Sequence, residues 1–236
     1  MVPRRRAARL LLGAFAAVVV VHLAAQVAGG DLVAGASQVL LMPLLAGVLW
    51  CDTLAPRSRL VMLALVALGL SWLGDSAPKL ASGDTSFLVM VGFFLLAQVA
   101  YIVAFWPFRG RSVLHRRRPL LLVYLAVVAA LVAACAAGAA GLLVPVLLYG
   151  ASLGAMAVLA TGVNRLTAVG GALFLASDGL IALDAFASGF DLPAQGFWVM
   201  STYVAAQVLI VAGVLREDAG ATATPTSTQT DAVRAR

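Results

Sequence analysis

The sequence is dominated by long apolar runs, each about as long as a membrane is thick. A helix needs about 20 apolar residues to cross the hydrocarbon core, and helices are the only open-chain structures that satisfy every backbone polar group in lipid. A transmembrane barrel would instead show short alternating segments. We therefore predict an all-α, polytopic membrane bundle of eight spans, at residues 9–28, 32–50, 59–76, 86–107, 119–137, 141–161, 167–187 and 195–215.

The composition excludes the soluble enzyme classes. Hydrophobic residues make up 63% of the 236 residues and charged residues only 11%, whereas a soluble domain carries about 25% charged residues. With two cysteines, no CxxC spacing and two histidines, the sequence indicates neither a metal site nor a cofactor. We expect residues 1–218 to form the transmembrane domain and residues 219–236, which are rich in Ala, Thr, Ser and Pro, to form a disordered cytoplasmic tail.

The basic residues predict the orientation of the spans. Every arginine flanks the spans on one side, and Lys79 is alone on the other. Since cytoplasmic loops are enriched in Lys and Arg, both termini are expected in the cytoplasm of a multi-pass protein of the cell membrane, and the arginine- and alanine-rich composition favours a bacterial source. The net charge of +6 therefore reports topology, and no nucleic acid is expected as a partner. The first span also resembles a signal peptide, but its length and the immediate start of the next span favour a membrane helix.

Three aspartates lie within the predicted spans. Asp178 is about 11 residues into the seventh span, near the midplane, where an aspartate costs about 2.5–3.5 kcal/mol. Such residues face the bundle interior and usually serve function, the alternative being a structural hydrogen bond. Asp75 lies late in the third span and is either part of a site or an interfacial cap. Asp184 lies six residues after Asp178, so we expect it to point elsewhere and to be solvated.

Uncharged polar side chains lie at similar depths in other spans. Two pairs are spaced three or four residues apart and therefore share a helix face. In lipid such groups need partners, so we predict one polar pocket near the midplane, open toward the outer half of the bilayer. Scattered helix–helix hydrogen bonds are the alternative. The candidate substrate-binding residues are Gln38, Gln98, Tyr101, Tyr149, Tyr203 and Gln207.

The two halves of the chain show a short internal similarity. Asp75 and Asp178 each lie in the third span of a four-span half, and residues 97–103 and 206–211, in the spans that follow, both read Ala-Gln-Val and then Ile-Val. Repeats of four spans would be related by an axis along the membrane normal, which would bring the two aspartates opposite each other. The match is short, so chance similarity is the alternative.

Three segments resemble the YhhN family of eight-span membrane proteins, which includes the lysoplasmalogenases. They are Ser-Trp-Leu-Gly-Asp at 71–75, the segment 92–105 around Ala-Gln-Val-Ala-Tyr, and Gly-Ala-Leu-Phe-Leu-Ala-Ser-Asp-Gly-Leu-Ile-Ala at 171–182. The Leu-Met-Pro-Leu-Leu stretch at 41–45 and the segment 203–207 also fit, so that the resemblance covers spans two to eight. The Gly-Asp and Phe-x-x-Ser-Asp motifs are specific together and weak singly.

This resemblance implies hydrolysis of the vinyl-ether bond of a lysoplasmalogen, a membrane lipid, to a fatty aldehyde and a glycerophospho-base. It implies Asp75 and Asp178 as the catalytic pair: two close carboxyls in a dry site tend to share one proton, so that one can donate it and the other can stabilise a cation. The chain has Gln98 where the family often has His, and Gln38 where it often has Lys. A lipid or small-molecule transporter and an inactive lipid-binding relative are the alternatives.

Overall fold

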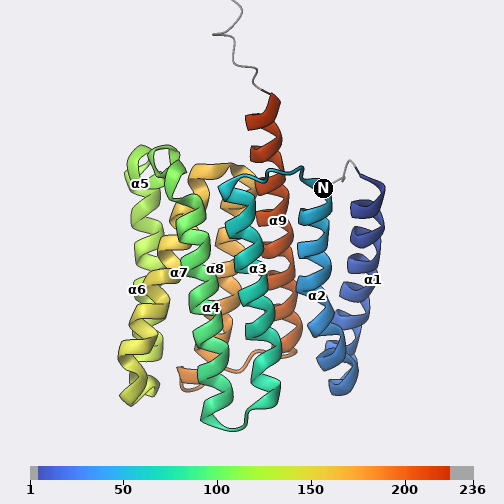
Figure 1. Ribbon diagram of the computed structural model, residues 1–236. Coiled ribbons are helices and arrows are strands. Elements are labelled where there is room, and N and C mark those ends of the chain that lie inside the picture. Colours follow the sequence, from blue (N-terminus) through green and yellow to red (C-terminus); the bar gives the residue numbers. More distant parts are fainter. Residues whose placement is uncertain (1–4, 224–236) are drawn as a thin grey trace, which may run out of the picture.

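The computed structural model describes residues 5–223, which form helices and no strand. Long helices run side by side along one direction (Figure 1) and are joined by short connections. The helices are α1 (Arg6–Ala28), α2 (Asp31–Asp52), α3 (Arg59–Ser76), η1 (Ala77–Leu80), α4 (Asp84–Phe105), η2 (Trp106–Arg111), α5 (Val113–Arg116), α6 (Arg118–Ala139), η3 (Ala140–Leu142), α7 (Leu143–Val163), α8 (Arg165–Phe186) and α9 (Gln195–Ala223).

Seven stretches of the described chain are long and apolar enough to cross a membrane, which supports a multi-pass membrane protein. One of them, residues 118–163, is 46 residues long and contains α6 and α7, which η3 separates. These two helices pack against each other (Figure 1). The all-helical membrane fold is therefore confirmed, and the eight separate spans and the four-span repeat stay predictions.

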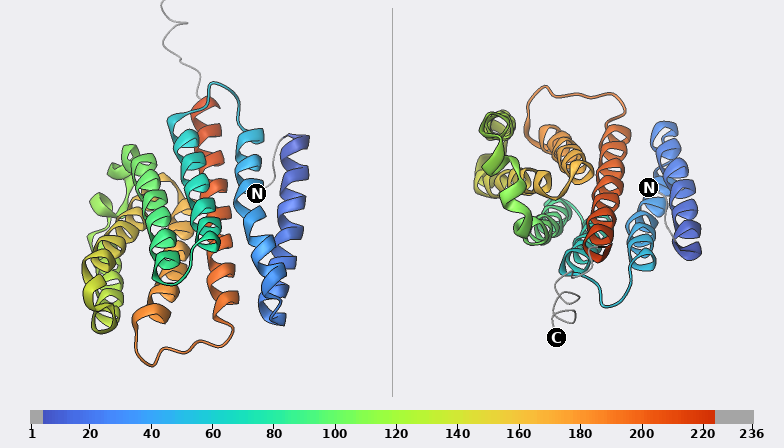
Figure 2. Two further views of the ribbon diagram at one scale, coloured as in Figure 1. Left: turned by 60° about the horizontal axis from the view of Figure 1, so that its bottom comes forward. Right: turned by 90° about the horizontal axis from the view of Figure 1, so that it is seen from above.

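Helix α9 lies at the centre of the bundle. Seen along the helices (Figure 2), it stands between the α1–α2 pair and the helices α6, α7 and α8, and it contacts α1, α2, α3, α7 and α8. The side chains that face inward are large and fully enclosed, among them Phe105 and Phe174. The outward side chains are also apolar, for example Val20, Leu122 and Leu148, as expected where the surrounding solvent is lipid.

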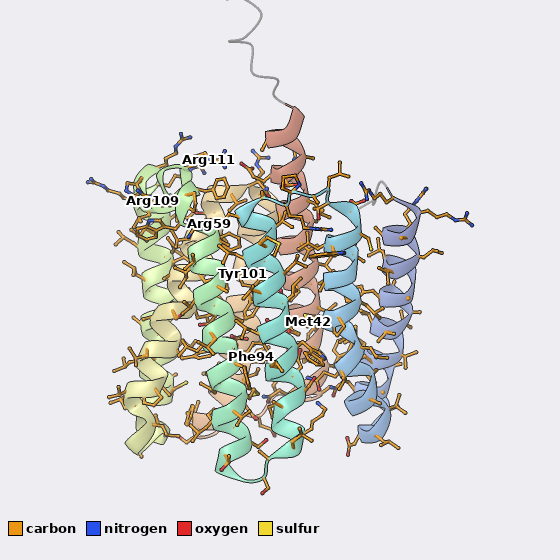
Figure 3. The ribbon with its side chains drawn as sticks, viewed as in Figure 1. Met42, Arg59, Phe94, Tyr101, Arg109 and Arg111 are labelled. Atoms are coloured by element: carbon orange, nitrogen blue, oxygen red, sulfur yellow. The ribbon has the colours of Figure 1, made fainter. Side chains whose placement is uncertain are left out.

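The two ends of the bundle differ in charge. Arg59, Arg109 and Arg111 lie together at one end (Figure 3), which we call the arginine end. The opposite end, which we call the lysine end, carries the α3–α4 connection with Lys79 and the α8–α9 connection at residues 187–194 (Figure 1). This separation agrees with the charge asymmetry of the sequence, and the assignment of the arginine end to the cytoplasm stays a prediction.

Local sequence explains several helix ends. Asn164 caps α8 by accepting hydrogen bonds from the backbone of Leu166 and Thr167, whose hydroxyl accepts in return from the Asn164 backbone N–H. Pro78 and Pro145 lie in the first turns of η1 and α7, where a missing N–H costs nothing, and Pro43 lies inside α2, which continues past it. Helix α9 extends to Ala223, so the predicted tail is helical over 219–223, and its remainder lies outside the described residues.

Candidate functional site

A polar cavity of about 550 Å³ lies toward the lysine end, with walls from α3, α8 and α9. Both aspartates that the sequence singled out, Asp75 and Asp178, line it. Each is almost fully buried, with 6% and 4% of its surface exposed. The structure thus brings together, on one cavity, two carboxyls that are 103 positions apart in the sequence, although no direct bond joins them.

Asp75 accepts one hydrogen bond on each carboxyl oxygen. The Gln38 amide Nε2 donates to Oδ1 at 3.1 Å, and the Tyr203 hydroxyl donates to Oδ2 at 2.9 Å. These donors come from α2 and α9, so three helices meet at this one side chain. A carboxyl group that accepts on both oxygens has the bonding pattern of the ionised form.

Asp178 is bonded differently, because both of its donors meet the same oxygen. The Tyr149 hydroxyl donates to Oδ2 at 2.6 Å and the Gln98 amide Nε2 donates to it at 3.1 Å. No residue of 5–223 donates to Oδ1. This oxygen is therefore the one on which Asp178 can carry a proton while keeping both of its hydrogen bonds.

Phe94 of α4 lies against both sides of the site. Its ring makes edge contacts with Tyr203 and Phe174, at centroid distances of 5.7 and 6.4 Å. The ring also fits directly over Gly74, where a Cβ atom would lie 2.8 Å from a ring carbon. The glycine of the Gly-Asp pair therefore has a steric reason: it lets the aromatic ring reach the cavity wall next to Asp75.

An apolar crevice adjoins the cavity between α4, α6, α7 and α8. Its walls include Val91, Leu131, Cys135 and Leu153, and it shares Asp178, Met90, Phe94 and Ile181 with the polar cavity. Asp178 consequently lies where an apolar space meets a polar one. The crevice is narrow, with a volume of about 60 Å³, so it can take only a short apolar part of a molecule whose polar end lies in the cavity.

A second set of polar residues closes the cavity on the side of the arginine end. The Tyr101 hydroxyl donates to Gln207 Oε1 at 2.7 Å, and Gln207 Nε2 donates to the Ser71 hydroxyl at 3.1 Å. All three side chains are fully buried, and none lines the cavity. Tyr101 and Gln207 were predicted to bind substrate. The structure places them in this interhelical chain, and a substrate-binding role for them stays a prediction.

The other four candidate residues contact the carboxyls directly: Gln38 and Tyr203 with Asp75, Gln98 and Tyr149 with Asp178. The buried Gln98 Oε1 has no partner among the described residues, so it is available to a hydroxyl group or a water molecule. The candidates divide by position: Gln38 and Tyr203 line the polar cavity and Tyr149 lines the apolar crevice, whereas Gln98, Tyr101 and Gln207 line neither. A substrate-binding role for these residues stays a prediction.

Sequence reasoning missed two charged residues of the cavity. Lys79 served only as a marker of topology, yet it lines the cavity, and its Nζ donates to Gln38 Oε1 at 2.8 Å and to the Asp75 backbone oxygen at 2.7 Å. Its position four residues after Asp75 was the signal for a shared face. Asp184 is exposed, as expected, but the expectation that it points away was wrong, because it also lines the cavity, which extends across α8 as it opens toward the lysine end.

Metal ligands do not gather at this site. Within the described part of the chain, no three residues of the types His, Cys, Asp and Glu are close enough to share a metal ion. The polar groups at the two aspartates are their carboxyls, the two phenols and two amides bonded to them, and the ammonium group of Lys79. Such a set can exchange protons with a substrate and bind its oxygen atoms.

Comparison with known proteins identifies the family. The model of the YhhN family matches residues 33–214. The lysoplasmalogenases of Mycobacterium bovis and Mycobacterium tuberculosis are each 36% identical to the chain over 163 residues, a match that covers 62% of this chain and 58% of each relative. The chain thus spans less than two thirds of those relatives' length, and no solved structure matches it significantly. Since the family match covers more than half of the sequence, including both aspartates of the cavity, the chain belongs to the YhhN family.

Proposed function

We propose that this protein is a membrane-embedded hydrolase that resembles lysoplasmalogenase and cleaves the vinyl-ether bond of a lysoplasmalogen-like lysolipid. The observation that carries the proposal is the position of Asp178, which lines both the apolar crevice and the polar cavity that contains Asp75. A lysolipid has one long chain and one polar head, and its vinyl-ether bond lies between them. With the first carbons of the chain in the narrow crevice and the head in the cavity, that bond lies beside Asp178.

The hydrogen bonds favour different roles for the two carboxyls. Asp178 is the acid, because its Oδ1 is free to carry a proton. Asp75 is the carboxylate, because it accepts on both oxygens and the Lys79 ammonium group is bonded to its backbone oxygen and to Gln38. Gln38 and Gln98 replace the Lys and His of the resemblance, and each still supplies an N–H donor to its aspartate.

The reaction follows from these roles. The Oδ1 proton of Asp178 moves to the alkene carbon farther from the ether oxygen, and the π electrons form the new C–H bond. The oxocarbenium ion that results is stabilised by the Asp75 carboxylate. Water adds to the cationic carbon and gives a proton to Asp75. As the hemiacetal opens, Asp75 returns this proton to the ether oxygen and the hemiacetal hydroxyl gives its proton to Asp178, releasing aldehyde and glycerophospho-base.

Isotope incorporation tests both the activity and the mechanism. Purified protein is incubated in D₂O with a lysoplasmenylethanolamine, the aldehyde product is trapped, and its mass is measured by mass spectrometry. Proton transfer to carbon predicts one deuterium on the carbon next to the carbonyl and a rate that is slower than in H₂O. Asp178→Asn removes the acid and should lower the rate by about 10²–10⁴-fold.

A matched control uses an aspartate outside the cavity. Asp191 is exposed in the α8–α9 connection, so Asp191→Asn should retain full activity. Aldehyde release that persists in Asp178→Asn would refute the acid role. Lysolipid binding without turnover by the wild-type protein would instead favour the inactive lipid-binding relative, and lipid movement across vesicles without product would favour a transporter.

A further inference from the structure

Two charged residues at the mouth of the cavity neither give nor accept a proton in the proposed reaction. Lys79 and Asp184 both line the cavity, and both are exposed to solvent. They come from different elements, η1 and α8, and carry opposite charges. Each lies on the lysine-end side of a catalytic candidate: Lys79 four residues after Asp75, and Asp184 six residues after Asp178.

Lys79 is held in place by neutral groups. Its Nζ donates to the side-chain oxygen of Gln38 and to the backbone oxygen of Asp75, at 2.8 and 2.7 Å. An ammonium group has three N–H donors, so these two bonds fix its position and leave one donor. Neither acceptor carries a charge. The ammonium group can therefore attract an anionic oxygen, such as that of a phosphate, into the cavity.

The depths of the charges follow the order of groups in a phospholipid. The Lys79 ammonium group lies beside Asp75, 2.7 Å from its backbone oxygen. At 1.5 Å per helical residue, Asp184 lies about 9 Å nearer the lysine end than Asp178. From the carboxyls outward, the cavity therefore presents first a cation and then an anion. A lysolipid with a zwitterionic head presents, from its ether bond outward, first a phosphate and then an ammonium group.

We propose that Lys79 and Asp184 are the residues that select the headgroup: Lys79 binds the phosphate and Asp184 binds the amine of a zwitterionic phospho-base. This inference rests on the proposed function for the identity of the lipid. It makes the two charges specificity determinants, which act on substrate binding and do not themselves give or accept a proton.

Binding of lipids that cannot be hydrolysed tests the proposal separately from catalysis. The probes are three saturated alkyl-ether lipids with the same chain: an alkylglycerol, an alkyl-glycerophosphate and an alkyl-glycerophosphocholine. For the wild-type protein in detergent, we expect the zwitterionic lipid to bind most tightly and the alkylglycerol most weakly. Microscale thermophoresis or native mass spectrometry gives the three affinities.

The substitutions should change the affinities for the three probes in different ways. Lys79→Gln should weaken binding of both phosphate lipids by roughly three- to tenfold and leave the alkylglycerol unchanged, with Lys79→Arg close to wild type. Asp184→Asn should weaken only the phosphocholine lipid, by roughly two- to fivefold, and should leave the glycerophosphate lipid bound equally well or better. Asp191→Asn, on the same end but outside the cavity, should change none of them.

Each outcome decides the question. Equal binding of the three probes by the wild type, or binding of none, would overturn the proposal. A loss that includes the alkylglycerol in Lys79→Gln would reveal a structural role only. Since the probes contain no vinyl ether, a wild-type protein that discriminates between them but releases no aldehyde from a lysoplasmalogen would refute the proposed function and retain the headgroup site. A wild-type protein that releases aldehyde normally but binds the three probes equally would refute the headgroup site and retain the proposed function.

Discussion

Two tyrosines offer a matched test of which aspartate gives its proton to the substrate. The Tyr149 hydroxyl donates to Asp178 at 2.6 Å and the Tyr203 hydroxyl donates to Asp75 at 2.9 Å. Tyr149→Phe and Tyr203→Phe each remove one hydroxyl group and leave the ring. Because the proposed roles of the two carboxyls differ, the same chemical change should have unequal effects on the rate.

The expected magnitude follows from the change in charge at each carboxyl. A hydrogen bond to a charged group contributes about 1.5–3 kcal/mol and one to a neutral group about 0.5–1.5 kcal/mol. Asp178 becomes charged as it gives up its proton, so the bond from Tyr149 strengthens in the transition state by roughly 1–1.5 kcal/mol. Tyr149→Phe should then lower kcat by about 5- to 15-fold. Asp75 is ionised before and during this step, so Tyr203→Phe should change kcat by less than about threefold.

Aldehyde release at saturating lysoplasmalogen gives kcat for the two variants. The thermal unfolding temperature of each, measured in the same detergent, shows whether the fold has been affected. A larger loss in Tyr203→Phe than in Tyr149→Phe would reverse the assignment of acid and carboxylate. Equal losses in both would refute the argument from charge development altogether.

Three further predictions concern packing and the crevice. Gly170→Ala should destabilise the fold by about 1–3 kcal/mol, because its Cβ would lie 2.8 Å from the Ala206 backbone oxygen, whereas Gly69→Ala, with no atom within 4 Å, should not lower the unfolding temperature. Asn164→Ala removes the α8 cap, worth about 1 kcal/mol, together with a 2.8 Å hydrogen bond to the Gly213 backbone oxygen. Asn164→Asp should keep the cap and lose only the bond to Gly213. Chemical denaturation compares the stabilities of the two variants. Cys135→Trp fills the crevice and should lower kcat/KM for long alkenyl chains by about tenfold, with a loss of folding stability of about 1–3 kcal/mol, while the lipid-facing Val123→Trp should leave kcat/KM unchanged.

The sequence predicted the helices well because lipid leaves the backbone few alternatives. The third predicted span, 59–76, coincides with α3, and the second, 32–50, lies within α2. The last span was too short: α9 continues past the apolar run into Arg216, Glu217 and Asp218 up to Ala223. Hydropathy marks where a helix leaves the lipid, but good helix formers can extend it into water, and no proline interrupts the run before Pro225.

The sequence singled out the polar residues around the two aspartates, but not which of them contact one another. The sequence placed Asp178 near the midplane and Asp75 late in its span, and only the internal similarity of the two halves set them opposite each other. The three- and four-residue spacings grouped Gln98 with Tyr101 and Tyr203 with Gln207 on shared faces. Which helices are neighbours is not contained in hydropathy, so the pairing of Gln38 with Asp75 and of Tyr149 with Asp178 could not be anticipated. The prediction that Asp184 points away from the site failed because it considered only the rotation between two residues of α8, whereas several helices line the cavity.

The shared faces also explain why the cavity opens toward one end. Ser71, Tyr101 and Gln207 lie three or four residues, about one helical turn, closer to the arginine end than Asp75, Gln98 and Tyr203 respectively, and they are bonded to one another without a gap for solvent. Figure 3 shows Tyr101 nearer the arginine end than Phe94, and Tyr101 stacks on Phe105 at 5.5 Å. This layer forms the floor of the cavity. A bound headgroup must therefore enter from the lysine end, past Lys79 and Asp184, so the residues proposed to select the headgroup stand on the route that a polar head can take.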